Sequence, residues 1–185
     1  MIELKNKSPN LLVVGDLMID QYFWGKSERI SPEAPVQVIN VSNESMVLGG
    51  AGNVINNLKV LGSNVDVISV IGNDENAIKL KDLLISINVE TKYLITEDNR
   101  ITSKKSRVIA SQQQVVRYDR ESIDEISKQS QKLILEIIKR IINNYDIVLI
   151  SDYGKGILST SLTQSIINVA SQNNKKVLID PKGLD

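Results

Sequence analysis

A glycine-rich segment, Leu48-Gly49-Gly50-Ala51-Gly52-Asn53, leads directly into an amphipathic run. Adjacent glycines let the backbone approach a ligand closely, in conformations that a Cβ atom forbids. The N–H groups in the first turn of a helix attract hydroxyl oxygens and anions, and the Asn53 amide both donates and accepts hydrogen bonds. We expect Gly49, Gly50 and Asn53 to form one wall of a small polar ligand site; the alternative is a tight turn with a capping Asn.

A second polar group, Gly15-Asp16, ends an apolar run over residues 11–14 that is typical of a buried strand. A carboxylate has several positions that accept hydrogen bonds from hydroxyl groups. We expect Asp16 to converge on the glycine-rich segment and to share its ligand. The alternative role for Asp16 is a helix or turn cap.

Composition excludes several kinds of chemistry. The 185 residues include 22 basic and 22 acidic side chains, for a formal net charge of +0, so no overall field draws the chain to nucleic acid or to an anionic membrane. The absence of Cys excludes thiol chemistry, and the absence of His excludes Ser-His-Asp catalysis and imidazole zinc sites. No apolar run approaches the roughly 18 residues of a membrane span. We expect a cytoplasmic protein with neither a nucleic-acid nor a membrane partner.

Apolar runs alternate with helical patterns along most of the chain. Strands are predicted over residues 11–14, 65–71, 147–150 and 177–179, all buried. Helices are predicted from Val54 to Gly62, with Val54, Leu58 and Leu61 on one face, and over residues 74–87, with Asp74 as N-cap, 124–143 and 159–172. This alternation indicates an α/β fold with a mostly parallel sheet flanked by helices.

Two regions, at about residues 18–41 and 91–118, interrupt the alternation. Within the second, residues 101–108 and 112–118 have the pattern of antiparallel strands. We interpret both regions as one small β-sheet that stands off the main body and acts as a lid over the strand ends. Residues 1–185 are therefore predicted to be part of one domain with a lid.

Five segments carry a family resemblance. Residues 13–20, 29–36 and 49–54 resemble the ribokinase-type (PfkB) carbohydrate kinases, and residues 150–156 and 179–183 resemble the bacterial heptose-7-phosphate kinases among them. This resemblance implies a ribokinase-like fold and transfer of phosphate from ATP, with Mg²⁺, to a sugar hydroxyl. For the heptose branch it implies transfer to O1 of a heptose 7-phosphate during synthesis of the lipopolysaccharide core, by a kinase that some relatives fuse to an adenylyltransferase.

The resemblance also implies roles for single residues. Asp16, Gly49, Gly50 and Asn53 match positions that bind the sugar. Asp20 and Asp152 resemble further positions on the substrate side, Asp152 because it follows the strand at residues 147–150. For Asp20 and Asp152, a surface or turn role is the alternative.

A substrate that already carries a phosphate needs cationic partners. Lys104, Lys105 and Arg107, on a predicted lid strand, are the candidates, with Lys105 and Arg107 on one face of the strand and Lys104 on the other. The alternative is a solvated edge strand kept soluble by its lysines. Arg117 and Arg29 are weaker candidates. Lys155 and Lys182, beside glycines after strand ends, are expected near the nucleotide phosphates, or else as exposed turn lysines.

One family motif is absent from residues 1–185. Ribokinase-type enzymes carry a Gly-Ala-Gly-Asp motif whose Asp is the catalytic base, and no such segment occurs here. We therefore expect the catalytic base to lie beyond Asp185, the C-terminal part of the fold to be missing, and the chain alone to have little or no kinase activity.

Two other functions stay open at this point. The first is a non-catalytic module that binds a sugar phosphate or dimerises through its lid, as lid strands do in this family. The second, more remote, is a dinucleotide-binding oxidoreductase, because Gly50-Ala51-Gly52 begins such a fingerprint. Ile55 stands where its third glycine belongs, and the polar residues 41–46 make a poor strand before it.

Overall fold

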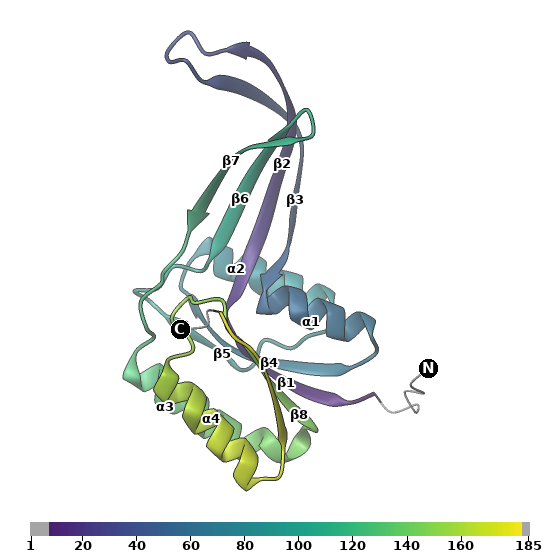
Figure 1. Ribbon diagram of the computed structural model, residues 1–185, viewed down its shortest axis with the longest axis vertical. Coiled ribbons are helices and arrows are strands. Elements are labelled where there is room, and N and C mark those ends of the chain that lie inside the picture. The colour runs from purple at the N-terminus through teal and green to yellow at the C-terminus, as the bar shows by residue number, and fades with distance from the viewer. Residues whose placement is uncertain (1–7, 183–185) are drawn as a thin grey trace.

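The computed structural model describes residues 8–182 and contains two β-sheets (Figure 1). Its strands are β1 (Asn10–Gly15), β2 (Leu17–Ile30), β3 (Gln37–Gly50), β4 (Asn64–Gly72), β5 (Leu94–Glu97), β6 (Lys104–Ala110), β7 (Gln113–Arg120), β8 (Ile147–Ser151) and β9 (Lys176–Asp180). Its helices are α1 (Ala51–Val60), α2 (Glu75–Ser86), α3 (Lys128–Ile141) and α4 (Thr160–Gln172), with a 3₁₀ turn at Ile142–Asn144.

The main sheet has the strand order β5-β4-β1-β8-β9, and all its neighbouring strands are parallel. Alternate side chains of β1 enter two separate cores. Leu12 and Val14 pack in the core under α3 and α4, while Val13 packs in the core under α1 and α2. The sheet is thus covered on both faces by helices (Figure 1), as the continuous apolar strands predict for an α/β fold.

Three helices begin at side-chain caps. The predicted cap Asp74 accepts a hydrogen bond from the Ala77 N–H at 2.9 Å, and Ser159 caps α4. The predicted start of the third helix near residue 124 was wrong, because Ser127 caps α3 and residues 121–127 are irregular. None of the helices within residues 8–182 is long and apolar enough to cross a membrane.

Two predictions of burial were also wrong. The inward face of α1 is formed by Ala51, Gly52 and Ile55, whereas Leu61 is exposed. Strand β9 lies at the edge of the main sheet, and Leu178 and Ile179 are about half exposed. An apolar run alone does not distinguish a central strand from an edge strand, because both have the same β-propensity.

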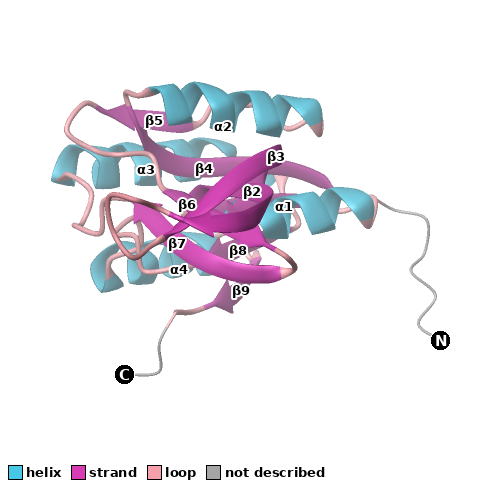
Figure 2. Cartoon of the chain, turned by 90° about the horizontal axis from the view of Figure 1, so that it is seen from above, coloured by secondary structure: helices cyan, strands magenta, loops and turns pink. Residues whose placement is uncertain are grey.

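The lid sheet has the order β3-β2-β6-β7 and stands off the main body (Figure 1). Strands β6 and β7 are antiparallel, as predicted, and β2 pairs with β6 in parallel. The lid extends further than the sequence suggests, because the polar residues 41–46 belong to β3, which runs without a break into α1. Strand β5, inside the second predicted lid region, instead pairs with β4 of the main sheet. Seen from above, the lid strands cross over the body while β9 lies at its margin (Figure 2).

Candidate functional site

The predicted site residue Asp16 lies between β1 and β2, where the main sheet meets the lid sheet. Its side chain is completely buried, and one carboxylate oxygen accepts the N–H groups of Tyr153 at 2.8 Å and Lys155 at 3.1 Å. The other oxygen accepts the Ile157 N–H at 3.4 Å. Burial raises the pKa of this carboxyl, although the backbone hydrogen bonds oppose the shift. Asp16 therefore ties the loop after β8 to β1, and a sugar hydroxyl would reach it only if that loop moved.

The loop at residues 152–157 owes its shape to two glycines with positive φ, Gly154 (64°) and Gly156 (79°). The Asp152 carboxylate accepts the Gly154 N–H at 2.7 Å, which gives Asp152 a turn role in this arrangement. Lys182 lies against the same turn, since a Cβ built on Gly154 would be 3.3 Å from its Nζ. The structure thus brings Asp152 and Lys182 together beside the loop that Asp16 holds.

The glycine pair at the end of β3 lies against the Asp20 carboxylate and the backbone of Asp16. A Cβ on Gly49 would come within 2.3 Å of an Asp20 carboxylate oxygen, and a Cβ on Gly50 within 2.6 Å of the Asp16 carbonyl oxygen. Gly50 also has φ +56°, and the Ala51 N–H donates to the Asp16 carbonyl at 3.0 Å. The Asp16 backbone and the Asp20 carboxylate thus lie against the glycine pair, whereas the Asp16 carboxylate faces the loop at residues 153–157.

Asn53 lies elsewhere. Its side chain is exposed and lines a hollow between α1, α2 and the end of β3, together with Asn56, Leu83 and Ser86. This places Asn53 on the side of α1 away from Ala51 and Ile55, which face the core. Binding of the sugar by Asn53 stays a prediction.

The basic side chains predicted to meet a phosphate are mostly paired with carboxylates. Arg107 donates to Asp20 at 2.5 Å, and its guanidinium lies over the Tyr22 ring, 5.3 Å from the ring centroid. Lys105 is bonded to Asp119 at 2.7 Å and to Glu121 at 3.3 Å. Strand alternation directs Lys104 to the opposite face of β6, as predicted. Among the weaker candidates, Arg117 pairs with Asp119 at 3.1 Å, and Arg29 is exposed near the far end of β2.

Lys155 joins the same group of charges. Its ammonium is mostly buried and donates to Glu121 at 2.7 Å, so Glu121 connects a lid lysine with a body lysine. Burial would raise the pKa of Glu121, but the hydrogen bond from Lys155 and the charge of Lys105 hold it below its usual value. We call Asp20, Arg107, Lys105, Asp119, Glu121 and Lys155 the lid-base cluster.

Sequence reasoning missed several residues here. Asp119 and Glu121 come from the run Arg117-Tyr118-Asp119-Arg120-Glu121, whose alternating charges were the only available signal. Arg100 was missed because it lies in an irregular segment. Its guanidinium donates to the backbone carbonyls of Lys155 and Asp124, and burial lowers its pKa. Arg100 thus holds the Lys155 loop through its backbone carbonyl, in addition to the bonds from that loop to Asp16.

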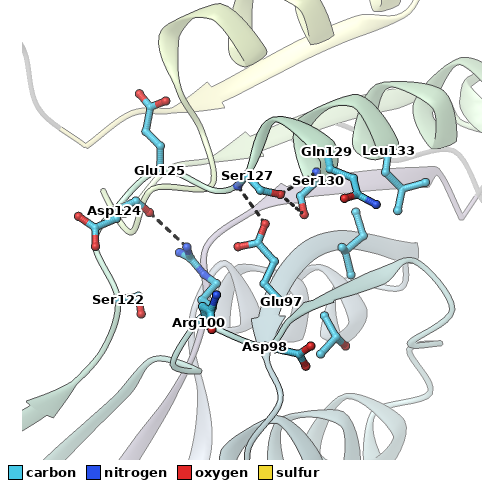
Figure 3. A pocket seen from close by; sticks show the side chains of 13 residues that line it. Glu97, Asp98, Arg100, Ser122, Asp124, Glu125, Ser127, Gln129, Ser130 and Leu133 are labelled. Atoms are coloured by element: carbon cyan, nitrogen blue, oxygen red, sulfur yellow. Dashed lines mark hydrogen bonds between the residues drawn. The ribbon is translucent and has the colours of Figure 1, made fainter.

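A separate open pocket of ≈ 570 Å³ lies between the end of β5 and the start of α3 (Figure 3). Glu97 points toward α3, where its carboxylate accepts the Ser127 N–H at 2.9 Å. The lining also contains Asp98, Asp124 and Glu125, with Arg100 turned toward the Asp124 carbonyl. This excess of acidic side chains repels a phosphate, whereas the lid-base cluster balances three carboxylates with three cations whose N–H groups could bind a phosphorylated ligand.

Residues 8–185 match the pfkB family of carbohydrate kinases. The chain is 63% identical over 180 residues to Bifunctional protein HldE of Aliarcobacter butzleri. The matched region covers 97% of this chain and 38% of that protein. It is 54% identical over 182 residues to the protein of the same name from Sulfurimonas denitrificans, covering 98% of this chain and 38% of that protein. The chain therefore spans little more than a third of the length of these curated relatives.

Solved structures share the fold at low sequence identity. Arabidopsis thaliana ribokinase complexed with ribose and ATP has a TM-score of 0.65 and 16% identity, over 96% of this chain and 55% of that chain. A carbohydrate kinase from Agrobacterium tumefaciens has a TM-score of 0.68 and 20% identity, over 92% of this chain and 53% of that chain. The predicted ribokinase-like α/β fold is confirmed.

Proposed function

The chain belongs to the pfkB family of carbohydrate kinases, and from this premise we propose that it supplies the sugar-binding part of a heptose kinase. The acceptor would be O1 of D-glycero-D-manno-heptose 7-phosphate and the donor ATP, in the synthesis of the lipopolysaccharide core. The heptose assignment is supported by residues 150–156 and 179–183 and by the similarity to the HldE proteins. Because ATP is a cytoplasmic metabolite, the reaction would run in the cytoplasm.

In the proposed reaction, a bond forms between O1 and the γ-phosphorus of ATP, and the bond from that phosphorus to the β–γ bridging oxygen breaks. ADP leaves, and the O1 proton passes to a general base. Phosphoryl transfer depends mainly on positioning and electrostatic stabilisation. No residue among 1–185 is assigned as the base, because the family's Gly-Ala-Gly-Asp motif is not in this sequence. We therefore expect the 185-residue chain to bind sugar with little or no turnover of ATP.

The observation that carries the proposal is the lid-base cluster, which places a carboxylate and a guanidinium next to a glycine turn. Asp20 and Arg107 are joined at 2.5 Å, and the Asp20 carboxylate lies against Gly49, where no Cβ narrows the space. A carboxylate accepts hydrogen bonds from sugar hydroxyls, and a guanidinium donates to a phosphate. Asp152 and, after movement of its loop, Asp16 would add acceptors on the body side.

For the nucleotide, Lys182 is the candidate on the body side, because it lies beside the Gly154 turn at the end of β8. Among residues 8–182, no three acidic side chains are grouped so as to hold a metal ion. No residue here is therefore assigned to Mg²⁺.

The lid offers a second role, which is pairing with another copy of the chain. All eight residues of β7 are exposed, and they include Val115, Val116 and Tyr118. An unpaired edge strand is a template for pairing with a further strand. This observation supports the alternative of a dimerising module. Sedimentation equilibrium should show a dimer that Val116→Lys dissociates; a monomer at all concentrations would contradict this role.

The sugar assignment can be tested by isothermal titration of the 185-residue chain. We expect heptose 7-phosphate to bind, and Asp20→Asn and Arg107→Met each to weaken binding about 10-fold or more, which is the value of one charge-assisted hydrogen bond. Arg29→Met, at the far end of β2, is the matched control. Unchanged affinity in both site variants would refute the proposed pocket, and ADP formation well above background would refute the expected lack of turnover.

A further inference from the structure

Two lysines from distant parts of the chain share one carboxylate. Lys105, on lid strand β6, lies 3.3 Å from one oxygen of Glu121, and Lys155, on the body loop after β8, lies 2.7 Å from the other. All three side chains are less than one-fifth exposed. Two ammonium groups thus converge on a single two-oxygen anion where the lid meets the body.

The three residues differ in how firmly they are held. Lys105 lies within a strand that pairs on both sides, with β2 and β7. The backbone of Lys155 donates to buried Asp16 and accepts from the Arg100 guanidinium. Glu121, in contrast, follows the last residue of β7 and belongs to the irregular segment before α3. The cations are therefore fixed by the fold, and the anion is on a connection that can move away from them.

A carboxylate and a phosphate present similar oxygens to an ammonium group, and both form charge-assisted hydrogen bonds with it. Each ammonium group has three donors. Lys155 uses one on Glu121, while Lys105 uses one on Glu121 and one on Asp119. Arg107 and Arg117 are paired with Asp20 and Asp119, so that four cations face three carboxylates in this region. A phosphate that replaced Glu121 would meet donors already aimed at an anion.

We propose that Lys105 and Lys155 form the site for the phosphate group of a sugar phosphate, and that the Glu121 carboxylate occupies this site until the ligand arrives. The inference rests on the proposed function and deepens it, because it assigns recognition of the substrate's phosphate to particular atoms. It also makes Glu121 an internal competitor of the ligand. Removal of its charge should therefore favour binding of the phosphorylated sugar.

The test compares D-glycero-D-manno-heptose 7-phosphate with the same heptose without phosphate, by isothermal titration of the 185-residue chain. Lys105→Met and Lys155→Met should each weaken binding of the phosphorylated sugar about 10-fold or more, since each removes a charge-assisted donor. Glu121→Gln should strengthen it several-fold, because a neutral amide competes less well for the lysines. None of the three variants should change the affinity for the unphosphorylated heptose by more than about 2-fold, because substitutions away from a ligand change its binding only slightly.

Two matched controls separate this site from general charge effects. Lys79→Met on α2 and Glu125→Gln in the acidic pocket change the net charge equally but lie outside the lid-base cluster. Both should leave the two affinities unchanged. Thermal unfolding of each variant identifies any that does not fold. If the Lys155→Met variant does not fold, Lys105→Met and Glu121→Gln still decide the question. Their side chains are more exposed, so these substitutions should disturb the fold less.

The outcomes distinguish the two proposals. If the wild-type chain binds neither heptose nor heptose 7-phosphate, the proposed function fails. If heptose binds but the lysine variants keep full affinity for the phosphorylated sugar, this inference alone is overturned. Weaker binding of heptose 7-phosphate by Glu121→Gln would also overturn it, since Glu121 would then support the ligand instead of competing with it.

Discussion

Strands β1 and β7 show how differently the two sheets of this chain are built. In β1, five of six residues are buried, and they enter cores on both faces of the main sheet. In β7, all eight residues are exposed. The main sheet is stabilised by burial of apolar surface, whereas the outer lid relies on strand pairing and on ion pairs, which contribute little when exposed.

This difference indicates separate roles for the body and the lid. The body fixes the positions of Asp16 and the Lys155 loop, because both are tied to the most buried strands. The lid carries Asp20, Lys105 and Arg107 near its base, where Ile19 of β2 still enters the core, whereas its outer strand β7 is exposed along its whole length. Exposed elements of this kind open at low free-energy cost. A rigid body and a lid that can open allow a site to admit a ligand and then to enclose it.

The largest effect should separate the two sheets directly. Leu12→Ala removes a completely buried side chain from the centre of the main sheet, so we expect the free energy of unfolding to fall by about 2–5 kcal/mol. Val116→Ala, on a half-exposed residue of β7, should change it by less than about 0.5 kcal/mol. Urea denaturation followed by circular dichroism measures both. Equal losses would show that the lid is as tightly packed as the body.

The next largest effect concerns the junction between lid and body. Gly50→Ala places a Cβ 2.6 Å from the Asp16 carbonyl oxygen at a residue with φ +56°, so strain and overpacking together should cost about 2–4 kcal/mol. Gly62→Ala is the control: its φ is +88°, but nothing lies within 4 Å of the added Cβ. It should cost only about 1 kcal/mol of backbone strain. Urea midpoints that fall equally in both variants would contradict the tight junction.

A third prediction is that Asp16 and Asp119 contribute to stability with opposite dependences on pH. Burial raises the pKa of Asp16, so the stability it contributes is present at low pH and is lost as the pH rises through that raised value. The hydrogen bond from Lys105 lowers the pKa of Asp119, so its contribution is present at higher pH and is lost as the pH falls through the lowered value.

The measurement is the free energy of unfolding of wild type minus variant, followed from about pH 3 to pH 6, around the ordinary carboxyl range. For Asp16→Asn this difference should decrease as the pH rises. For Asp119→Asn it should increase. Slopes of the same sign would show that body and lid carboxyls lie in similar environments.

The smallest effect should come from the ion pair between Arg117 and Asp119 on lid strand β7. Arg117 and Asp119 lie 3.1 Å apart, and Arg117 is about half exposed. A double-mutant cycle with Arg117→Met and Asp119→Asn should give a coupling free energy of about 0.2–1 kcal/mol, as for other exposed pairs. A coupling above about 2 kcal/mol would show that the lid is stabilised by its charges to the degree that the body is by its core.

The body was well predicted from sequence, and the lid was predicted less accurately. Local patterns predicted the strands at residues 11–14, 65–71 and 147–150, the helix cap at Asp74 and the start of a helix near Ser159, since continuous apolar runs and capping residues act within a few positions. The polar residues 41–46 were not expected to form a strand. They do so because β2 pairs with them on both sides of an irregularity at Ser42.

The candidate site shows the same division. Residue types indicated that Asp16, Gly49 and Gly50 share a site, and the family resemblance added Asp20. The partners of the basic residues could not be predicted in this way. Glu121 lies 16 positions from Lys105 and 34 from Lys155, and no local pattern encodes a pairing over those separations.

The sequence by itself therefore determined the fold class, the parallel core and the identity of the residues that line the strand ends, because hydrophobic periodicity and glycine conformation act locally. Only the tertiary structure decided which partners the side chains of those residues contact and how far they are buried. It buried Asp16 under three backbone amides, turned Asn53 away from the site, and gave Lys105 and Lys155 a common carboxylate. These outcomes depend on which long-range contacts the packed chain makes, and charge pairing across a sheet junction exists only after the two sheets have been brought together.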